Sequence, residues 1–310
     1  MSREPRIALL FGGISDEREI SIGSGKAAAE AFSRFVDVEL MDVVSAALPS
    51  ELDPERHIVF STLHGTFGED GQIQRLMDEA GVEYAGCDAA SSALTFDKIE
   101  TKRVLAEAGV PVLKQVVFKN GQVPNVDLVI DRFGEHVVVK PNRQGSSIGL
   151  HLCASRSELE AALVTASEGE WLIEPRVNGR EATVAVVDGR AFEIVEIKPL
   201  SGRFDFESKY TKGKTEFIVP APFDAELSSL IKRIAENAYV ACGCRDYIRI
   251  DFMITHEGEP YVLEINTLPG LKETSLLPMS AAASGLNFEK MLQKLVEPAR
   301  LRFNLKYSIC

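Results

Sequence analysis

The sequence lacks a long apolar run. No segment approaches the roughly 20 consecutive apolar residues that a helix needs to cross a bilayer, so we expect no membrane span. The apolar run at residues 6–11 is too short for the apolar region of a secretory signal peptide, and no convincing cleavage site follows it.

Cysteine is scarce and scattered. Cys87, Cys153, Cys242, Cys244 and Cys310 are odd in number and form no disulfide framework, which is typical of a reducing compartment. We therefore expect a cytoplasmic protein. Cys242 and Cys244 lie two residues apart with no second pair, so we expect no zinc site there.

Positive charge is in deficit. The chain has 34 Lys and Arg against 46 Asp and Glu, a net charge of −12. Non-specific binding of nucleic acid needs a surplus of cations that displaces counterions, so we expect no nucleic-acid partner. The deficit does not exclude the binding of one small anion in a locally basic pocket.

Three common nucleotide-binding and catalytic motifs are missing. Gly213-Lys214-Thr215 has the second half of a phosphate-binding P-loop, but Ser208 stands where that motif needs glycine. No Gly-x-Gly-x-x-Gly follows a strand, and no Gly-x-Ser-x-Gly elbow marks a serine hydrolase.

The first part of the chain alternates between strand and helix patterns. Residues 6–11 and 57–63 are short apolar runs that predict strands. Each is followed by glycines and then by helical spacing, at residues 17–32 and 72–80. Such alternation predicts a parallel sheet with crossover helices.

The rest of the chain is richer in strand patterns. A helix is predicted up to Gly109, and hairpin turns are predicted at residues 188–189 and 257–258. With 310 residues, the chain is long enough for two or three domains. We expect an α/β fold, α+β in parts, with domains at residues 1–95, 96–176 and 177–310.

A polar loop follows one predicted strand. Lys140 ends the strand, and Gln144, Gly145, Ser146 and Ser147 follow it. Free backbone amides and hydroxyls beside a lysine make a phosphate cradle. An ordinary surface hairpin explains the same residues.

Acidic residues interrupt two apolar strands. Arg249 and Asp251 share one face of the first strand, and Glu264 and Asn266 lie on the second. Buried carboxylates repel, and Mg²⁺ accepts such oxygen ligands and is usually completed by substrate phosphates, so we favour a magnesium site. The alternative is a solvated face whose charges pair with Arg249.

Three further loops carry polar residues. The glycine-rich loop at residues 63–74 contains His64 and follows a strand, where α/β proteins bind ligands, although it is also a helix entry. Glu17 lies near a helix start, where acids are favoured anyway. The segment at about 200–220 is either a lid over a reacting site or a disordered insertion.

Eight segments, taken in order, resemble those of the D-alanine–D-alanine ligases of the ATP-grasp superfamily. They span residues 7 to about 300 and read FGGISDEREIS, HGTFGEDGQIQ, TFDKIETKRVLAEAGVPV, VVKPNRQGSSIG, LIEPRVNGREATVAV, FESKYTKGKTEF, RIDFM and LEINTLPGLKETSLLP. The resemblance implies a three-domain ATP-grasp fold with ATP bound between the central and C-terminal domains. It also implies ligation of two D-alanine molecules through an acyl phosphate, for peptidoglycan synthesis in the cytoplasm, by a homodimer.

The resemblance implies a site for ATP and metal. The nucleotide-binding residues that it implies are Lys98, Lys140, Ser146, Ser147, Glu174, Val177, Glu181, Met253 and Leu263. The implied ligands of Mg²⁺, with Mn²⁺ as an alternative, are Asp251, Glu264 and Asn266.

The resemblance also implies residues for the amino acids and for catalysis. Glu17 matches the acid that holds the ammonium of the first D-alanine. The substrate-binding set is completed by His64, Ser275 and Leu276. The implied catalytic residues, besides Glu17, are Ser146, Lys209, Tyr210, Arg249 and Gly270, with Lys209 and Tyr210 in the lid.

The chain departs from the family pattern at three places. Lys272 stands where threonine is common, and it either alters the second substrate's subsite or points to solvent; we favour solvent. Phe206 and Arg203 replace common lid aromatics. The rival functions are a ligase of other amino acids and a non-catalytic nucleotide-binding protein.

Overall fold

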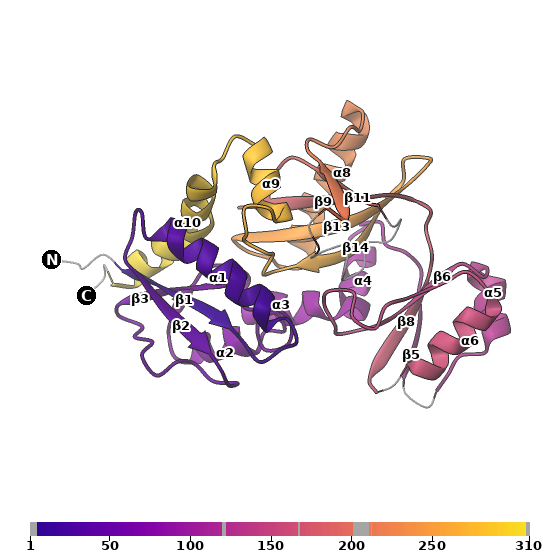
Figure 1. Cartoon of the computed structure of the whole chain (residues 1–310), viewed down its shortest axis with the longest axis horizontal. Helices are drawn as coiled ribbons and strands as arrows, with labels where there is room; N and C mark the ends of the chain where they lie inside the picture. Colours follow the sequence, from indigo (N-terminus) through magenta and orange to yellow (C-terminus); the bar gives the residue numbers. More distant parts are fainter. Residues whose placement is uncertain (1–4, 120–121, 167, 201–210, 212, 308–310) are drawn as a thin grey trace.

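The computed structural model describes residues 5–119, 122–166, 168–200, 211 and 213–307 (Figure 1). Within these residues the strands form three sheets, which confirms the predicted α/β fold with α+β parts. No helix in the described part of the chain combines the length and the apolar character that crossing a membrane requires.

The first sheet is parallel, as predicted, with the order β2-β1-β3-β4. Alternate side chains of its β1 strand pack on opposite faces: Ile7 and Leu9 on one, Ala8 and Leu10 on the other. Burial on both faces explains why the strand is a continuous apolar run. Its strands are β1 (Arg6–Gly12), β2 (Val38–Val43), β3 (His57–Ser61) and β4 (Glu83–Tyr84).

Helices cover both faces of this sheet. One face packs against α1 and the C-terminal helix α10, and the other packs against α2 (Figure 1). The chain therefore closes on itself, because its last helix shares a core with its first strand. The helices are α1 (Arg18–Phe32), α2 (Gln72–Glu79), α3 (Ala89–Phe96) and α10 (Phe288–Tyr307).

The second sheet is antiparallel, with the order β5-β8-β6-β7. Two helices cover it and bury Val129 and Leu159 in a core of its own. Its elements are β5 (Val116–Lys119), α5 (Val126–Phe133), β6 (Val137–Pro141), β7 (His151–Cys153), α6 (Arg156–Thr165) and β8 (Glu170–Pro175).

The third sheet is antiparallel along β12-β11-β9-β13-β14, with β10 paired to β9. Helices α4 and α8 pack on it through Leu105 and Ile231. Its strands are β9 (Gly179–Val187), β10 (Arg190–Ala191), β11 (Val195–Pro199), β12 (Thr215–Ile218), β13 (Tyr247–Thr255) and β14 (Pro260–Asn266). The helices are α4 (Lys98–Glu107), α8 (Ala225–Ala241) and α9 (Leu276–Ala283).

The α3–α4 junction connects the first sheet to the other two (Figure 1). Asp97 ends α3 and caps α4, where its Oδ1 accepts from the backbone N–H of Glu100 at 3.0 Å. The helix that the sequence predicts at residues 96–109 corresponds to α4, which begins after this break. The domain boundaries near residues 95 and 176 stay predictions.

Candidate active site

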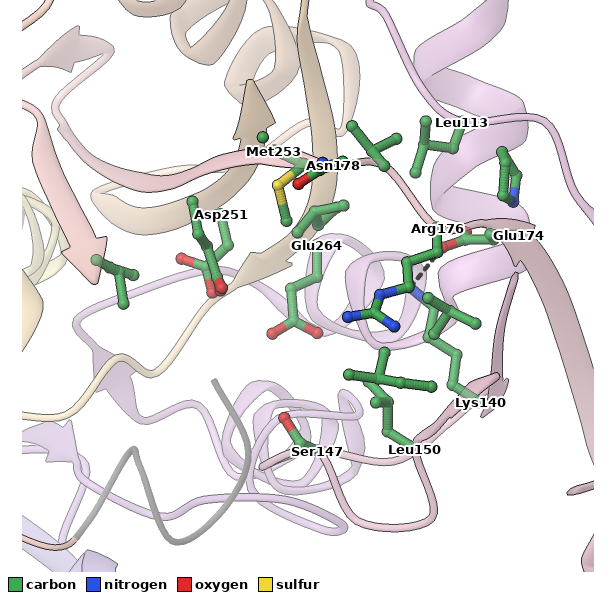
Figure 2. A pocket seen from close by; sticks show the side chains of 18 of the residues that line it. Leu113, Lys140, Ser147, Leu150, Glu174, Arg176, Asn178, Asp251, Met253 and Glu264 are labelled. Atoms are coloured by element: carbon green, nitrogen blue, oxygen red, sulfur yellow. Dashed lines mark ion pairs between the residues drawn. The ribbon is translucent and has the colours of Figure 1, made fainter. Parts of the chain in front are cut away.

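A cavity of about 830 Å³ opens between the second and third sheets (Figure 2). Lys140 and Glu174 line it from β6 and β8. Asp251 and Glu264 line it from β13 and β14, and Ser147 borders it from the loop after β6. Four strands and one loop thus contribute polar groups to one space.

Most of the predicted nucleotide residues line this cavity. The members found there are Lys98, Lys140, Ser147, Glu174, Val177, Glu181, Met253 and Leu263. Ser146 is not among the lining residues, although its neighbour Ser147 is. The structure brings the set together, and the role of each residue stays a prediction.

Glu174 is a buried acid at one end of the cavity that pairs with two lysines. Its side chain is 2% exposed, and Lys140 Nζ lies 2.9 Å from its Oε2, the ion pair drawn in Figure 2. Lys102 from α4 forms a second ion pair, with Oε1. The sequence reading missed Lys102, because a lysine inside a helical pattern looks like a solvated residue.

The acidic residues of β13 and β14 converge. Asp251 lies directly opposite Glu264 across the strand pair, and Arg249 lies opposite Asn266. Arg249 donates to both carboxylate oxygens of Asp251, at 2.9 and 2.8 Å. The two acids thus lie opposite each other, and Asp251 pairs with Arg249, while the magnesium site stays a prediction.

The donor chemistry of this group fits a hard cation. Asn266 Nδ2 donates to Asp251 Oδ2 at 3.1 Å, so the amide oxygen of Asn266 is not used in this hydrogen bond. Asp251, Glu264 and Asn266 offer oxygen donors alone, the type that Mg²⁺ prefers. The described residues contain no cluster of three or more His, Cys, Asp and Glu side chains able to hold a metal. Two carboxylates and one amide leave coordination positions for other ligands, such as substrate oxygens.

Lys98 ties the polar loop to the acidic group. Its Nζ donates to the carbonyl of Gln144 at 2.8 Å and lies 3.6 Å from Oε2 of Glu264. In that loop Ser146 and Ser147 have φ values of 50° and 59°, in the left-handed region that non-glycine residues rarely adopt. A loop of this kind, whose backbone belongs to no strand or helix, is a candidate for anion binding through its amides.

A second group of side chains lies at the carboxyl ends of β1 and β3. These strands are neighbours in the first sheet, so Glu17 and His64, which follow them, come close together. Glu17 is buried and accepts a hydrogen bond from Ser146 Oγ. A Cβ placed on Gly145 or on Gly65 would lie 2.8 Å from Glu17 Oε2, so both glycines leave room for this carboxylate.

Glu69 also belongs to this group, although the sequence analysis did not predict it as a site residue. Its Oε2 accepts from the backbone N–H of Gly65 at 2.7 Å. Burial, together with the negative charge of Glu17, raises the pKa of Glu69 to about 8. Its position directly before Asp70, in a loop after a strand, was the available signal.

His64 is held neutral. Burial, and then the positive charge of Arg249, lower its pKa to about 4. A ring nitrogen donates to the backbone carbonyl of Leu268, and Nε2 has no hydrogen-bond partner among the residues that the structure describes.

The segment after β14 completes this region. A Cβ on Gly270 would lie 3.1 Å from Ser275 Oγ, and that oxygen accepts from the backbone N–H of Lys272 at 3.2 Å. Leu276 begins α9 and is buried. The exposed Lys272 lies along α1, because a Cβ on Gly23 would meet its Cε at 2.4 Å.

The lid prediction falls mostly outside the described residues. Lys209, Tyr210, Phe206 and Arg203 all lie there. Their proposed roles stay predictions.

Family models match two parts of the chain. The model described as D-ala D-ala ligase N-terminus matches residues 39–87, and the model described as D-ala D-ala ligase C-terminus matches residues 104–297. The second match alone covers more than half of the chain, and it includes every residue that lines the cavity except Lys98.

Curated relatives and solved structures agree with these models. The chain is 39% identical over 301 residues to a D-alanine–D-alanine ligase of Methylacidiphilum infernorum, with 96% of each chain covered. It is 40% identical over 302 residues to one of Geobacter sulfurreducens, covering 96% of this chain and 95% of the relative.

Two solved structures resemble the fold closely. A D-alanine–D-alanine ligase of Bacillus anthracis complexed with ATP has a TM-score of 0.85 and 28% identity, covering 97% of this chain and 99% of that one. A D-Ala:D-Ser ligase of Enterococcus faecalis has a TM-score of 0.83 and 30% identity, covering 96% and 100%. The ATP-grasp fold, the family models and near-complete relatives at 39–40% identity lead to one conclusion: the chain belongs to the D-alanine–D-alanine ligase family.

Proposed function

We propose that this chain joins two D-alanine molecules to D-alanyl-D-alanine and converts one ATP to ADP and phosphate. The observation that carries the proposal is that the cavity adjoins the buried Glu17 at the ends of β1 and β3. A cavity lined by Lys98, Lys140 and Glu264 adjoins a buried acid, Glu17, through the hydrogen bond from Ser146. A nucleotide in the cavity would place its terminal phosphate beside an amino acid held at Glu17.

Glu17 would hold the ammonium group of the first D-alanine. A substrate ammonium would give this buried carboxylate a partner of opposite charge in addition to the hydrogen bond from Ser146. With the ammonium held there, the substrate carboxylate can face the polar loop. Its oxygen would attack the γ-phosphorus of ATP, and the bond to the bridging oxygen would break and release ADP.

Lys98, Lys140 and Arg249 would stabilise the charge that develops on the transferring phosphoryl group. Asp251, Glu264 and Asn266 would hold Mg²⁺, with Mn²⁺ as an alternative. Bound there, the ion neutralises phosphate charge in a way that side chains alone cannot. The oxygen donors of these three residues support this assignment, and Lys98 would then exchange Glu264 for phosphate.

The second D-alanine would bind near Ser275 and Leu276. The backbone N–H groups at the start of α9 favour a carboxylate there. Its free amine would attack the acyl carbon, lose a proton and expel phosphate. Arg249 and the Gly270 backbone would stabilise the oxyanion, and a lid carrying Lys209 and Tyr210 would exclude water from the acyl phosphate.

A second candidate is ligation of D-alanine to another D-residue. The observation that favours it is the likeness to a D-Ala:D-Ser ligase, whose TM-score is close to that of the D-alanine–D-alanine ligase. Lys272, next to the second subsite, is the departure that could alter the choice. We favour D-alanine because the curated relatives at 39–40% identity are D-alanine–D-alanine ligases.

The cellular setting follows from the family resemblance. We propose that the dipeptide enters peptidoglycan synthesis in the cytoplasm and that the chain acts as a homodimer.

Phosphate release tests the proposed function. The chain is incubated with ATP, Mg²⁺ and one amino acid at a time from a panel of D- and L-isomers, and then with pairs that include D-alanine. We expect release with D-alanine alone. No turnover with D-alanine alone refutes the proposal, and turnover only with D-alanine plus D-serine establishes the second candidate.

A further inference from the structure

Lys102 is a buried lysine to which the proposed reaction assigns no role. It lies on α4 one turn after Lys98, so both side chains share one face of the helix. Lys98 reaches towards the polar loop and Glu264. Lys102 reaches the opposite end of the cavity and contacts Glu174. One helix face thus supplies Lys98, which lines the cavity, and Lys102, which contacts the lining residue Glu174.

Two amines hold the Glu174 carboxylate. Lys102 is paired with Oε1, and Lys140 Nζ lies 2.9 Å from Oε2. The side chains of Lys102 and Glu174 are 4% and 2% exposed, so neither can exchange its partner for water. Lys102 Nζ also lies 3.4 Å from the carbonyl oxygen of Leu113, a residue that lines the cavity.

This arrangement makes Glu174 an acceptor. Burial, and then the charges of Lys140 and Lys98, lower the pKa of Lys102. A lysine amine donates hydrogen bonds in either protonation state. Each carboxylate oxygen therefore faces a donor and keeps a second lone pair for a ligand.

We propose that Lys102 is a positioning residue that keeps Glu174 an acceptor and thereby selects adenine over guanine. The inference rests on the proposed function, in which Glu174 faces the adenine edge. The adenine 6-amino group donates to such a carboxylate. Guanine presents a carbonyl oxygen at the same position, and two acceptors repel.

Removal of Lys102 changes what Glu174 can do. Lys102→Met keeps the length of the side chain and leaves the carboxylate with Lys140 as its cationic partner. A buried carboxylate that loses one of its two hydrogen-bond donors takes up a proton more readily. The protonated acid donates a hydrogen bond, which a guanine carbonyl accepts.

The test is the ratio of ADP to GDP affinity, measured by isothermal titration calorimetry on the full chain with Mg²⁺. We expect the original chain to prefer ADP and Lys102→Met to reduce that preference about 10-fold or more, the scale of one hydrogen bond to a charged group. Lys102→Gln, a milder change, should reduce it in the same direction and keeps the test available if the methionine variant does not fold.

Arg103→Met is the matched control, because Arg103 neighbours Lys102 on α4 but is exposed and pairs with Glu100 and Glu107. It should leave the ratio unchanged. A merely structural role for Lys102 would weaken the binding of ADP and GDP equally, and that result overturns the inference.

In steady-state kinetics, we expect Lys102→Met to raise the KM for ATP with little change in kcat.

The binding assay needs no amino acid, so it separates the two proposals. A chain that prefers ADP and loses the preference in Lys102→Met supports the inference even if D-alanine is not its substrate. A chain without adenine preference overturns the inference even if it ligates D-alanine.

Discussion

His64 makes the stability of the ligand-free chain depend on pH. Its folded pKa is about 4, against 6.5 for an unperturbed histidine. Between these values the unfolded chain binds more protons than the folded chain, so this contribution to stability is lost as the pH falls. A difference of about 2.5 pKa units corresponds to about 3 kcal/mol in total, of which about 2 kcal/mol is lost between pH 7.5 and pH 5.

Glu69 acts in the opposite direction over part of the same range. Its pKa is raised to about 8, against 4.5 for an unperturbed glutamate. The folded chain therefore binds the extra proton between these values, and this contribution to stability is lost as the pH rises. The pH profile of the original chain combines both effects, so His64 has to be isolated by a difference between two chains.

His64→Asn provides that difference. Asparagine keeps an amide N–H that can reach the Leu268 carbonyl, but it does not titrate. Urea unfolding, followed by far-ultraviolet circular dichroism at pH 7.5 and pH 5, gives the free energy of unfolding of each chain. The original chain should lose about 2 kcal/mol more than the variant between the two pH values. Equal losses would refute the argument that His64 is buried and neutral.

Two further predictions concern turnover and the core. Asp251→Ala and Glu264→Ala should each abolish phosphate release, because both remove a proposed metal ligand, while circular dichroism should stay unchanged; a fully active double variant would contradict the metal assignment. Leu292→Ala should lower the free energy of unfolding by about 2–5 kcal/mol, because Leu292 is fully buried where α10 packs on the first sheet. Leu301→Ala on the same helix, 57% exposed, is its control and should change stability by less than about 0.5 kcal/mol. Equal effects in urea titrations would exclude the proposed packing of α10.

Local patterns predicted the elements that are strongly periodic or bounded by glycine. The helix α2 and the hairpin turn between β13 and β14 are examples. Helices α5 and α6 were missed, although α6 carries a readable signal: Ser155 Oγ accepts from the Glu158 backbone, and Glu158 Oε2 accepts from the Ala154 backbone. A capping box predicts where a helix begins, but it involves few residues and is a weak signal when the apolar pattern after it is also weak.

Residue types and their local spacing were enough to predict the family, the strands that end in polar residues and the type of donor at each candidate position. Those properties are local, because they depend on residue type and on spacing within one element. The pairing of Asp251 with Asn266 needed the register of β13 against β14. Register depends on how the whole sheet packs, and no single strand encodes it.

Burial was decided by the tertiary structure alone. Lys102 and Arg103 are adjacent on α4, yet Lys102 is 4% exposed and Arg103 is 54% exposed. The helical pattern allows either residue to face solvent. Which one becomes the buried partner of Glu174 depends on where the second and third sheets lie against the helix, because a charged side chain is buried only where the rest of the fold supplies its counter-charge.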